Sequence, residues 1–151
     1  MKQKLPEPML QAFAEAKAAA ARGEVPVGAI VVSAKGEVLS AAGNRTLHDQ
    51  DPTAHAEILA IRAAAKALGS ERLVDCDLYV TLEPCAMCAA AISFARIRRV
   101  YFAASDEKMG AVENGPRFFA QATCHHKPEV YSGIGESEAK SLLTDFFKSR
   151  R

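Results

Sequence analysis

Four residues at two places in the chain have the side chains that a catalytic zinc site needs. His55 is followed two positions later by Glu57, and Cys85 and Cys88 stand three positions apart, directly after Pro84. Sulfur and imidazole nitrogen are ligands that zinc prefers, whereas magnesium and calcium take oxygen. Three protein ligands leave the fourth tetrahedral position open to water, as in catalytic zinc sites. Glu57 is then the natural group to take a proton from that water.

The spacing of these residues predicts that they meet at one metal ion. On the first turn of a helix, the sulfurs of Cys85 and Cys88 would face the same side. The positive end of the helix dipole would also favour their thiolate forms. We expect His55 in the first turn of a second helix. Each half of the pattern is weak alone, but His-x-Glu combined with Pro-Cys-x-x-Cys is the signature of zinc-dependent nucleobase deaminases.

Other interpretations of these residues remain open. A structural zinc site would need a fourth ligand, for which the candidates are Cys76, Cys124, His48, His125 and His126. Such a site would leave Glu57 without a role. A redox Cys-x-x-Cys pair would not explain His55, and the metalloprotease motif His-Glu-x-x-His is absent.

Length and composition indicate a single folded domain, residues 1–151. The chain is 49% hydrophobic and 25% charged, which excludes a disordered protein. Its net charge of +1 excludes a strong electrostatic attraction of the whole protein to nucleic acid, so any basic contact surface must be local. The N-terminus lacks the apolar core of a signal peptide, and no apolar run approaches a membrane span. We therefore expect a cytoplasmic enzyme with no membrane partner, whose four cysteines are thiols or metal ligands.

Hydrophobic periodicity and turn residues predict the elements that must position the site. A helix is expected at residues 7–22, followed by a hairpin of strands 27–32 and 37–42. Asp51 and Pro52 should open a second helix, with Asp51 as its cap and Gly69 as its end. Strands are then expected at 77–82, 99–103 and 130–134, with helices at 86–95 and 136–148. Residues 105–127 show the least regular pattern.

This order predicts an α/β fold with three layers, α/β/α, around a mixed five-stranded sheet. In such sheets, binding sites form at the carboxyl ends of the strands. Both candidate metal segments should begin helices that lead away from that edge.

Several further motifs resemble one known family over nearly the whole chain. The motifs are residues 24–29, 43–45, 51–57, 78–88 and 96–100, Asp106-x-Lys108-x-Gly110, and residues 142–147. With them, the chain resembles the cytidine/deoxycytidylate deaminase superfamily and, more narrowly, the bacterial tRNA-specific adenosine deaminases. The resemblance implies a cytidine deaminase-like fold, a homodimer, and conversion of the wobble adenosine of a tRNA anticodon loop to inosine.

The resemblance also implies roles for individual residues. One zinc ion per chain would be bound by His55, Cys85 and Cys88, and Glu57 would be the general acid and base. Asn44 would contact the flipped base, although Gly43-Asn44 also suits a simple turn. Asp106 would touch the nucleic acid beside that base, although its position also suits the cap of a loop.

Two substrate contacts follow from residue chemistry. Lys108 suits a phosphate contact, although a lysine here is also typical of a solvated surface. A helix cannot turn both Phe146 and Phe147 towards the core, so one of them, with Phe147 as our candidate, could stack on RNA. The chain departs from the usual family pattern at residues 112–119, where a Ser-Leu-Met run is missing. We therefore assign no RNA contact to residues 112–127.

Two rival functions share the same metal pattern. The first is a zinc deaminase that acts on a free base, nucleoside or nucleotide, such as guanine or deoxycytidylate. The second is a scaffold that needs zinc only for folding, which would give Glu57 no purpose.

Overall fold

The computed structural model describes residues 4–150, and its centre is a five-stranded sheet with the order β2-β1-β3-β4-β5. The strands are β1 (Gly28–Val32), β2 (Val38–Gly43), β3 (Asp77–Leu82), β4 (Arg99–Ala104) and β5 (Glu129–Tyr131). β1 pairs antiparallel with β2 and β3, whereas β3, β4 and β5 are parallel. The predicted α/β class with a mixed five-stranded sheet is confirmed.

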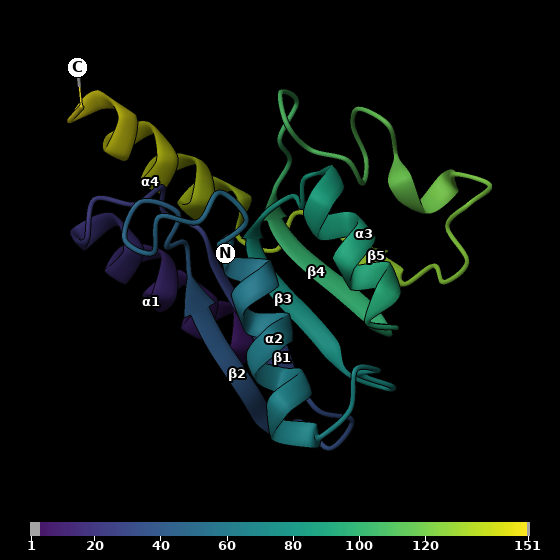
Figure 1. The fold of residues 1–151 in the computed structure, drawn as a ribbon. Helices are drawn as coiled ribbons and strands as arrows, with labels where there is room; N and C mark the ends of the chain where they lie inside the picture. Colours follow the sequence, from purple (N-terminus) through teal and green to yellow (C-terminus); the bar gives the residue numbers. More distant parts are fainter. Residues whose placement is uncertain (1–3, 151) are drawn as a thin grey trace.

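Within residues 4–150, four α-helices cover the two faces of the sheet (Figure 1). They are α1 (Glu7–Ala21), α2 (Ala56–Leu68), α3 (Ala86–Phe94) and α4 (Glu136–Lys148). α1 and α4 pack on one face in one hydrophobic cluster. α2 and α3 pack side by side on the other face in a second cluster. The predicted three layers are therefore present.

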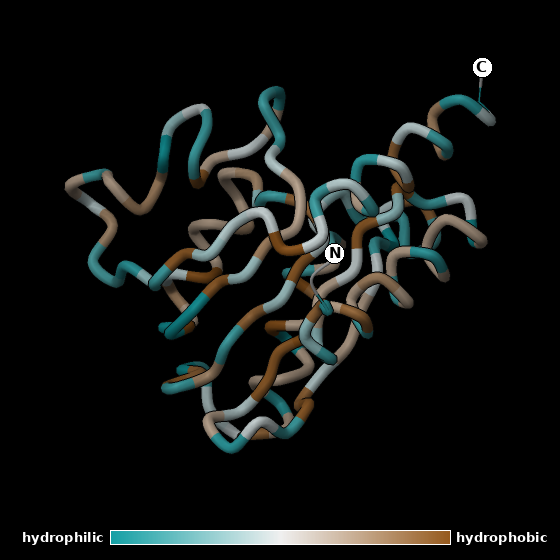
Figure 2. Tube along the Cα trace, turned by 180° about the vertical axis from the view of Figure 1, so that it is seen from behind, coloured by the Kyte–Doolittle hydropathy of each residue, from teal (hydrophilic) through white to brown (hydrophobic). Residues whose placement is uncertain are grey.

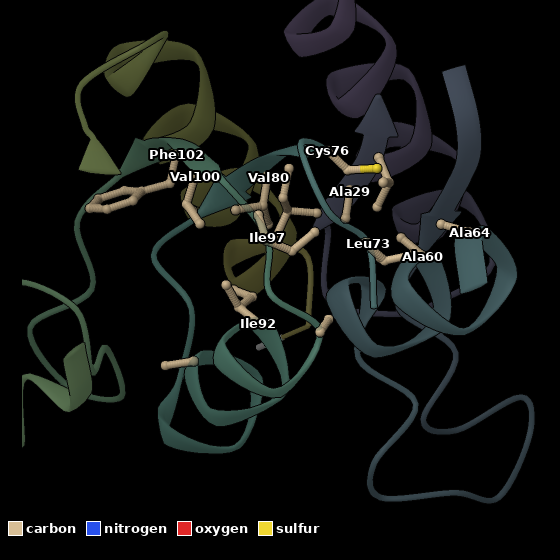
Figure 3. Packing of buried hydrophobic residues seen from close by; sticks show 14 of the residues in the cluster. Ala29, Ala60, Ala64, Leu73, Cys76, Val80, Ile92, Ile97, Val100 and Phe102 are labelled. Atoms are coloured by element: carbon tan, nitrogen blue, oxygen red, sulfur yellow. The ribbon is translucent and has the colours of Figure 1, made fainter. Parts of the chain in front are cut away.

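The strands are held in place because both of their faces are covered. All five residues of β1 are buried, as expected for a strand between two layers of helices. Figure 2 shows the hydrophobic colour along the inner strands and the hydrophilic colour at the turns. On the α2 and α3 side, Figure 3 shows Val80, Val100 and Phe102 of the sheet gathered with Ile92 of α3. This packing holds the start of α3, where Cys85 lies, against the end of β3.

Two glycines allow α1 to lie close to the hairpin. Gly28 and Gly43 are paired across β1 and β2. A Cβ atom on Gly28 would lie 2.7 Å from the Ala16 backbone nitrogen, and one on Gly43 would lie 2.8 Å from the Glu15 carbonyl oxygen. Both distances are shorter than real contacts allow, so a side chain at either position would push the helix off the sheet.

The second helix begins later than predicted. α2 begins at Ala56, not at Asp51 and Pro52, and it ends at Gly69 as expected. The Asp51 carboxylate does not cap a helix. It instead accepts hydrogen bonds from the backbone N–H and the hydroxyl of Thr53, at 2.9 and 2.7 Å. The cue for a helix start was wrong because Asp-Pro suits a turn as well as a helix.

The remaining predicted elements agree with the structure to within a few residues. α1 ends at Ala21, β5 begins at Glu129 and ends at Tyr131, and α4 covers 136–148 as predicted. The irregular segment 105–127 contains a short 3-10 helix at Phe118–Ala120. Arg151 lies outside the described residues. In the part of the chain that the structure describes, no helix has the length and apolar character needed to cross a membrane.

Candidate metal centre and active site

His55, Cys85 and Cys88 come together at one point. His55 Nδ1 lies 3.6 Å from Cys85 Sγ and 3.5 Å from Cys88 Sγ, and the three ligand atoms lie within 4.8 Å of one another. Zinc bonds of about 2.3 Å to sulfur and about 2.0–2.1 Å to nitrogen, at tetrahedral angles, separate the two ligand atoms by about 3.5–3.6 Å. The side chains therefore already have the spacing of a zinc site.

The starts of two helices position these ligands. His55 immediately precedes α2, and Cys85 immediately precedes α3, with Cys88 in the first turn of α3. His55 is thus one residue outside the helical turn in which we expected it. The two helices are held side by side by the core on this face of the sheet (Figure 1). Their positive ends meet at the site and favour anionic ligands.

The pKa values of the two thiols move in opposite directions. A hydrogen bond from Cys88, followed by one from His55, lowers the pKa of Cys85 to about 4 despite its partial burial. The hydrogen bond to Cys85 and burial raise the pKa of Cys88. Two thiolates side by side repel each other, and a doubly charged cation removes that repulsion. The hydrogen bond to Cys85 also raises the pKa of His55.

Glu57 lies in the first turn of α2 beside these ligands, and its side chain is only 4% exposed. Burial is the main reason why its pKa is raised to about 7. A carboxyl group with a pKa near neutrality can both accept and donate a proton under working conditions. Glu57 does not belong to the group of possible metal ligands, which suits a proton carrier next to the metal.

The alternative of a four-ligand structural site has no support in the structure. In the described part of the chain, no other histidine, cysteine or carboxylate joins the group of three. Cys124 instead contacts the Ser93 hydroxyl at 3.4 Å, and the His126 ring contacts the Ile97 carbonyl oxygen at 2.6 Å. Cys76 is buried in the core on the α2 and α3 face.

Asn44 lies at the start of α2, the helix that follows His55, and has a structural role that the sequence did not predict. Its Oδ1 accepts a hydrogen bond of 2.8 Å from the Ala56 backbone N–H, the first N–H of α2. Asn44 therefore caps the helix directly after His55. Among residues 4–150, its Nδ2 amide donates to no partner, so this half of the side chain remains available to a ligand.

Three of the predicted substrate contacts line one pocket of about 790 Å³: Asp106, Lys108 and Phe147. Val25, Leu82, Ser105, Met109 and Leu143 are among its other lining residues. The pocket lies at the carboxyl ends of β3 and β4, between the loop after β4 and helix α4. The three candidate metal ligands do not line it, but Cys85 forms a β-bridge with Gly110, next to the lining residue Met109.

The structure distinguishes between the two neighbouring phenylalanines. Phe147 is 50% exposed and lines the pocket. Phe146 is half-buried, and the Arg150 guanidinium lies 4.2 Å from the centre of its ring. Asp106 also acts as the cap of its own loop, because its Oδ1 accepts hydrogen bonds of 3.1 Å from the N–H groups of Lys108 and Met109.

Two buried carboxylates, Glu24 and Glu83, border the site and were not predicted from the sequence. Glu24 is 1% exposed and accepts hydrogen bonds from the backbone N–H groups of Leu47 and His48, at 3.2 and 2.8 Å. Glu83 is 3% exposed and binds the loop after β4. The available signal was an acidic residue beside apolar residues, just before β1 for Glu24 and directly after β3 for Glu83.

Comparison with known proteins agrees with this geometry. Residues 2–104 match the family model described as the cytidine and deoxycytidylate deaminase zinc-binding region. The chain therefore belongs to this family of zinc-dependent hydrolytic deaminases, and zinc is its cofactor. It is 60% identical to the tRNA-specific adenosine deaminase of Agrobacterium fabrum over 140 residues, which are 93% of this chain and 91% of the relative.

Two solved structures are also similar to this chain in sequence and fold. One, from a study of A-to-I editing by tRNA:A34 deaminases at the wobble position, has a TM-score of 0.88 and 60% identity, and covers 90% of this chain and 98% of its own. The other is the guanine deaminase of Bacillus subtilis, with a TM-score of 0.63 and 40% identity. That match covers 65% of this chain and 62% of the other.

Proposed function

We propose that this protein is a tRNA-specific adenosine deaminase that converts the wobble adenosine of an anticodon to inosine and releases ammonia. The observation that carries the proposal is the triangle of His55, Cys85 and Cys88, with a buried Glu57 beside it and a substrate-sized pocket next to it. The 60% identity to a tRNA-specific adenosine deaminase over nearly the whole chain supports this substrate.

His55, Cys85 and Cys88 hold one zinc ion per chain in this proposal. A zinc ion there supplies a nucleophile at neutral pH, because it lowers the pKa of a bound water to about 7. Glu57 moves the protons. Its carboxylate takes one proton from the attacking water and delivers it to ring N1. It then takes the second proton from the oxygen now bonded to C6 and passes it to the amine, which leaves C6 as ammonia. Burial excludes bulk water from this exchange, so the proton stays within the site.

The substrate contacts in this proposal come from the residues around the metal centre. The free amide half of Asn44 donates to the base. Asp106 accepts from a hydroxyl of the neighbouring nucleotide, Lys108 binds a phosphate, and Phe147 stacks on an unpaired base. An anticodon loop offers such unpaired bases, whereas C6 of an adenine in a duplex is out of reach.

The protein acts as a homodimer in the cytoplasm, and residues 1–151 form one domain in this proposal. Ala89 and Ile92 of α3 are fully buried in the core, so they cannot form the dimer contact. The accessible face of α3 instead carries Phe94, which is 76% exposed. Phe94 borders a hollow on α2 and α3 that Ile58, Ile61 and Ala91 also line, and we place the interface there. Cys76, Cys85, Cys88 and Cys124 form no disulfide in the described residues, which suits a reducing compartment.

The test of this function is deamination of four substrates side by side: an anticodon stem-loop, adenosine, cytidine and guanine. We expect the stem-loop to have by far the highest kcat/KM, because only it reaches the side chains of the 790 Å³ pocket. The guanine deaminase relative makes guanine the informative competitor. If guanine or a free nucleoside is deaminated as efficiently as the stem-loop, the enzyme acts on small molecules instead.

A further inference from the structure

The loop after β4 carries half of the pocket but contains little regular structure. Residues 105–109 line the pocket, and the chain then turns back past the metal segment. Backbone N–H groups of such a loop need partners, or the loop cannot hold one conformation. Four of these N–H groups and one side-chain amide donate to a single carboxylate, that of Glu83.

The five hydrogen bonds use both oxygens of this carboxylate. Oε1 accepts from the Asp106 N–H at 3.0 Å and from Asn114 Nδ2 at 2.7 Å. Oε2 accepts from the N–H groups of Val112, Glu113 and Asn114, at 3.0, 2.9 and 3.1 Å. Only an ionised carboxylate accepts this many bonds without donating one. Hydrogen bonds to a charged acceptor are also stronger than those to a neutral one.

The loop fits closely around this carboxylate. Gly110 passes directly over it, and a Cβ atom at Gly110 would lie 2.5 Å from Glu83 Cδ and 2.6 Å from Glu83 Oε2. Through its five hydrogen bonds, the Glu83 carboxylate holds both ends of the loop, residue 106 and residues 112–114.

The short segment that begins with Glu83 also contains the metal ligand Cys85. The Pro84 carbonyl oxygen accepts from the Ala111 N–H at 2.9 Å, and Cys85 forms a β-bridge with Gly110. The backbone of Glu83 itself donates to the Ala104 carbonyl oxygen of β4 at 2.8 Å. Residues 83–85 thus connect the end of β4, the pocket loop and the metal centre over three consecutive positions.

We propose that Glu83 is a positioning residue that sets the pocket loop, with Asp106 and Lys108, at a fixed place relative to the metal ligand Cys85. The inference rests on the proposed function, because it assumes that the loop contacts the substrate. In the proposed function, the metal centre and Glu57 act on one base while the loop contacts the neighbouring nucleotides. The loop and the metal centre must therefore keep a fixed position relative to each other during binding. Displacement of a substrate-contacting group by about 1 Å can cost about 100-fold in rate.

The experiment compares Glu83→Gln with two matched variants of the full-length zinc-loaded enzyme. Glu83→Gln keeps the shape of the side chain but replaces one acceptor oxygen by an NH2 group. That group donates hydrogen bonds and cannot accept them from the N–H groups of the loop. Glu113→Gln makes the same change on an exposed side chain of the same loop. Glu24→Gln removes another buried carboxylate, which binds residues 46–48 instead of the pocket loop. Amide hydrogen exchange, zinc content and the kinetics on an anticodon stem-loop are measured for each.

For Glu83→Gln we expect amide exchange at 106 and 112–114 to become about 10-fold faster or more, with unchanged zinc content. The KM for the stem-loop should rise about 10-fold or more, with a smaller change in kcat. Glu24→Gln should loosen residues 46–48 but not 106–114, and Glu113→Gln should change nothing. A second substitution, Asn114→Asp, gives the new amide an acceptor and should restore part of the protection in the loop.

Two results would overturn the proposal. The first is unchanged exchange at 106 and 112–114 in Glu83→Gln. The second is faster exchange through the whole chain with loss of zinc, which would make Glu83 a general stability residue. If the wild-type enzyme does not deaminate the stem-loop, the proposed function fails. The exchange and zinc measurements still show in that case whether Glu83 holds the loop.

Discussion

Glu57 must hold a proton at one stage of the proposed reaction and release it at another. Its burial in the first turn of α2 raises its pKa to about 7, so that both protonation states are accessible near neutral pH. Burial alone would make an ionised carboxylate unfavourable, but the neighbouring His55 partly offsets this cost. The buried position of Glu57 therefore places its carboxylate beside the metal ligands and gives it a pKa that suits proton transfer.

Substitution of Glu57 by glutamine should abolish most turnover and leave the protein folded. Glutamine has nearly the same shape but cannot carry the proton, so we expect kcat to fall by about 10²–10⁴-fold. Zinc content and the unfolding temperature should stay close to those of the wild type. The control is Glu37→Gln, the same change on an exposed side chain between β1 and β2. Activity near the wild-type level in Glu57→Gln would show that this residue is structural.

Cysteine substitutions should separate the metal ligands from the other thiols. Cys85→Ala removes one of three ligands and should lower the zinc content well below one ion per chain. Cys124→Ala removes a buried thiol that contacts Ser93 and the His126 carbonyl oxygen, and should leave zinc bound. Metal analysis of both purified variants measures this directly. Full metal content in Cys85→Ala would exclude the proposed site.

The metal ligands and Glu57 could be predicted because their chemistry appears in residue type and spacing. Glu83 and the capping role of Asn44 could not be predicted in this way. A buried carboxylate looks like any surface glutamate until the fold shows which N–H groups surround it. Both roles depend on contacts between residues 12 to 31 positions apart, which spacing within a motif does not reveal.

At the scale of elements, the start of α2 decides where His55 and Glu57 point. Asn44, at the beginning of the loop after β2, caps this helix with its Oδ1. The Asp51-Pro52 pair, which local rules favour as the helix start, instead forms a turn within the same loop. The helix begins where the chain meets the metal ligands, because tertiary contacts from Asn44 supply the cap there.

Two substitutions of Asn44 should separate its capping role from its proposed contact with the base. Asn44→Ala removes both and should destabilise the fold by about 1 kcal/mol, the usual cost of losing a helix cap. Asn44→Asp keeps an oxygen acceptor for the Ala56 N–H but removes the amide donor. We expect its unfolding temperature to match the wild type while activity on the stem-loop falls. If Asn44→Asp is fully active, the residue is only a cap.

The end of α4 should contribute to binding of RNA through Phe147. Its ring is half exposed at the pocket, whereas Phe146 lies under Arg150. Phe147→Ala should weaken the kcat/KM for the stem-loop by an amount equivalent to about 1–3 kcal/mol, the value of one base stacked on an aromatic ring. Zinc content should not change. Phe146→Ala is the comparison, and an equal loss in both variants would indicate damage to the helix rather than loss of stacking.

At the scale of the whole molecule, the layer arrangement could be predicted well, but the segment between β4 and β5 could not. Strands and helices alternate with clear periodicity, so the sheet and its helices follow from local pattern and packing rules. Residues 105–127 lack such a pattern because their order depends on Glu83 and on contacts of Phe119 with the core on the α2 and α3 face. This segment also departs from the usual family pattern, so the resemblance gave no guide to it.

Phe94 exposes 76% of its side chain at the end of α3, beside a hollow lined by Ile58 and Ile61. Exposed aromatic side chains next to an apolar hollow are typical of protein interfaces, because their burial removes apolar surface from water. A two-fold dimer would place this surface against its own copy. This surface lies on α2 and α3, the two helices that begin beside the candidate metal ligands.

Phe94→Glu should therefore convert the protein to a monomer, since it places a charge at the centre of the interface. We expect light scattering to show a dimer of the wild type at micromolar concentration and about half that mass for the variant. Leu10→Glu is the control, because Leu10 is also a partly exposed apolar residue but lies on α1, on the opposite face of the sheet. It should remain dimeric. A wild-type monomer, or a dimer that survives Phe94→Glu, would place the interface elsewhere or exclude it.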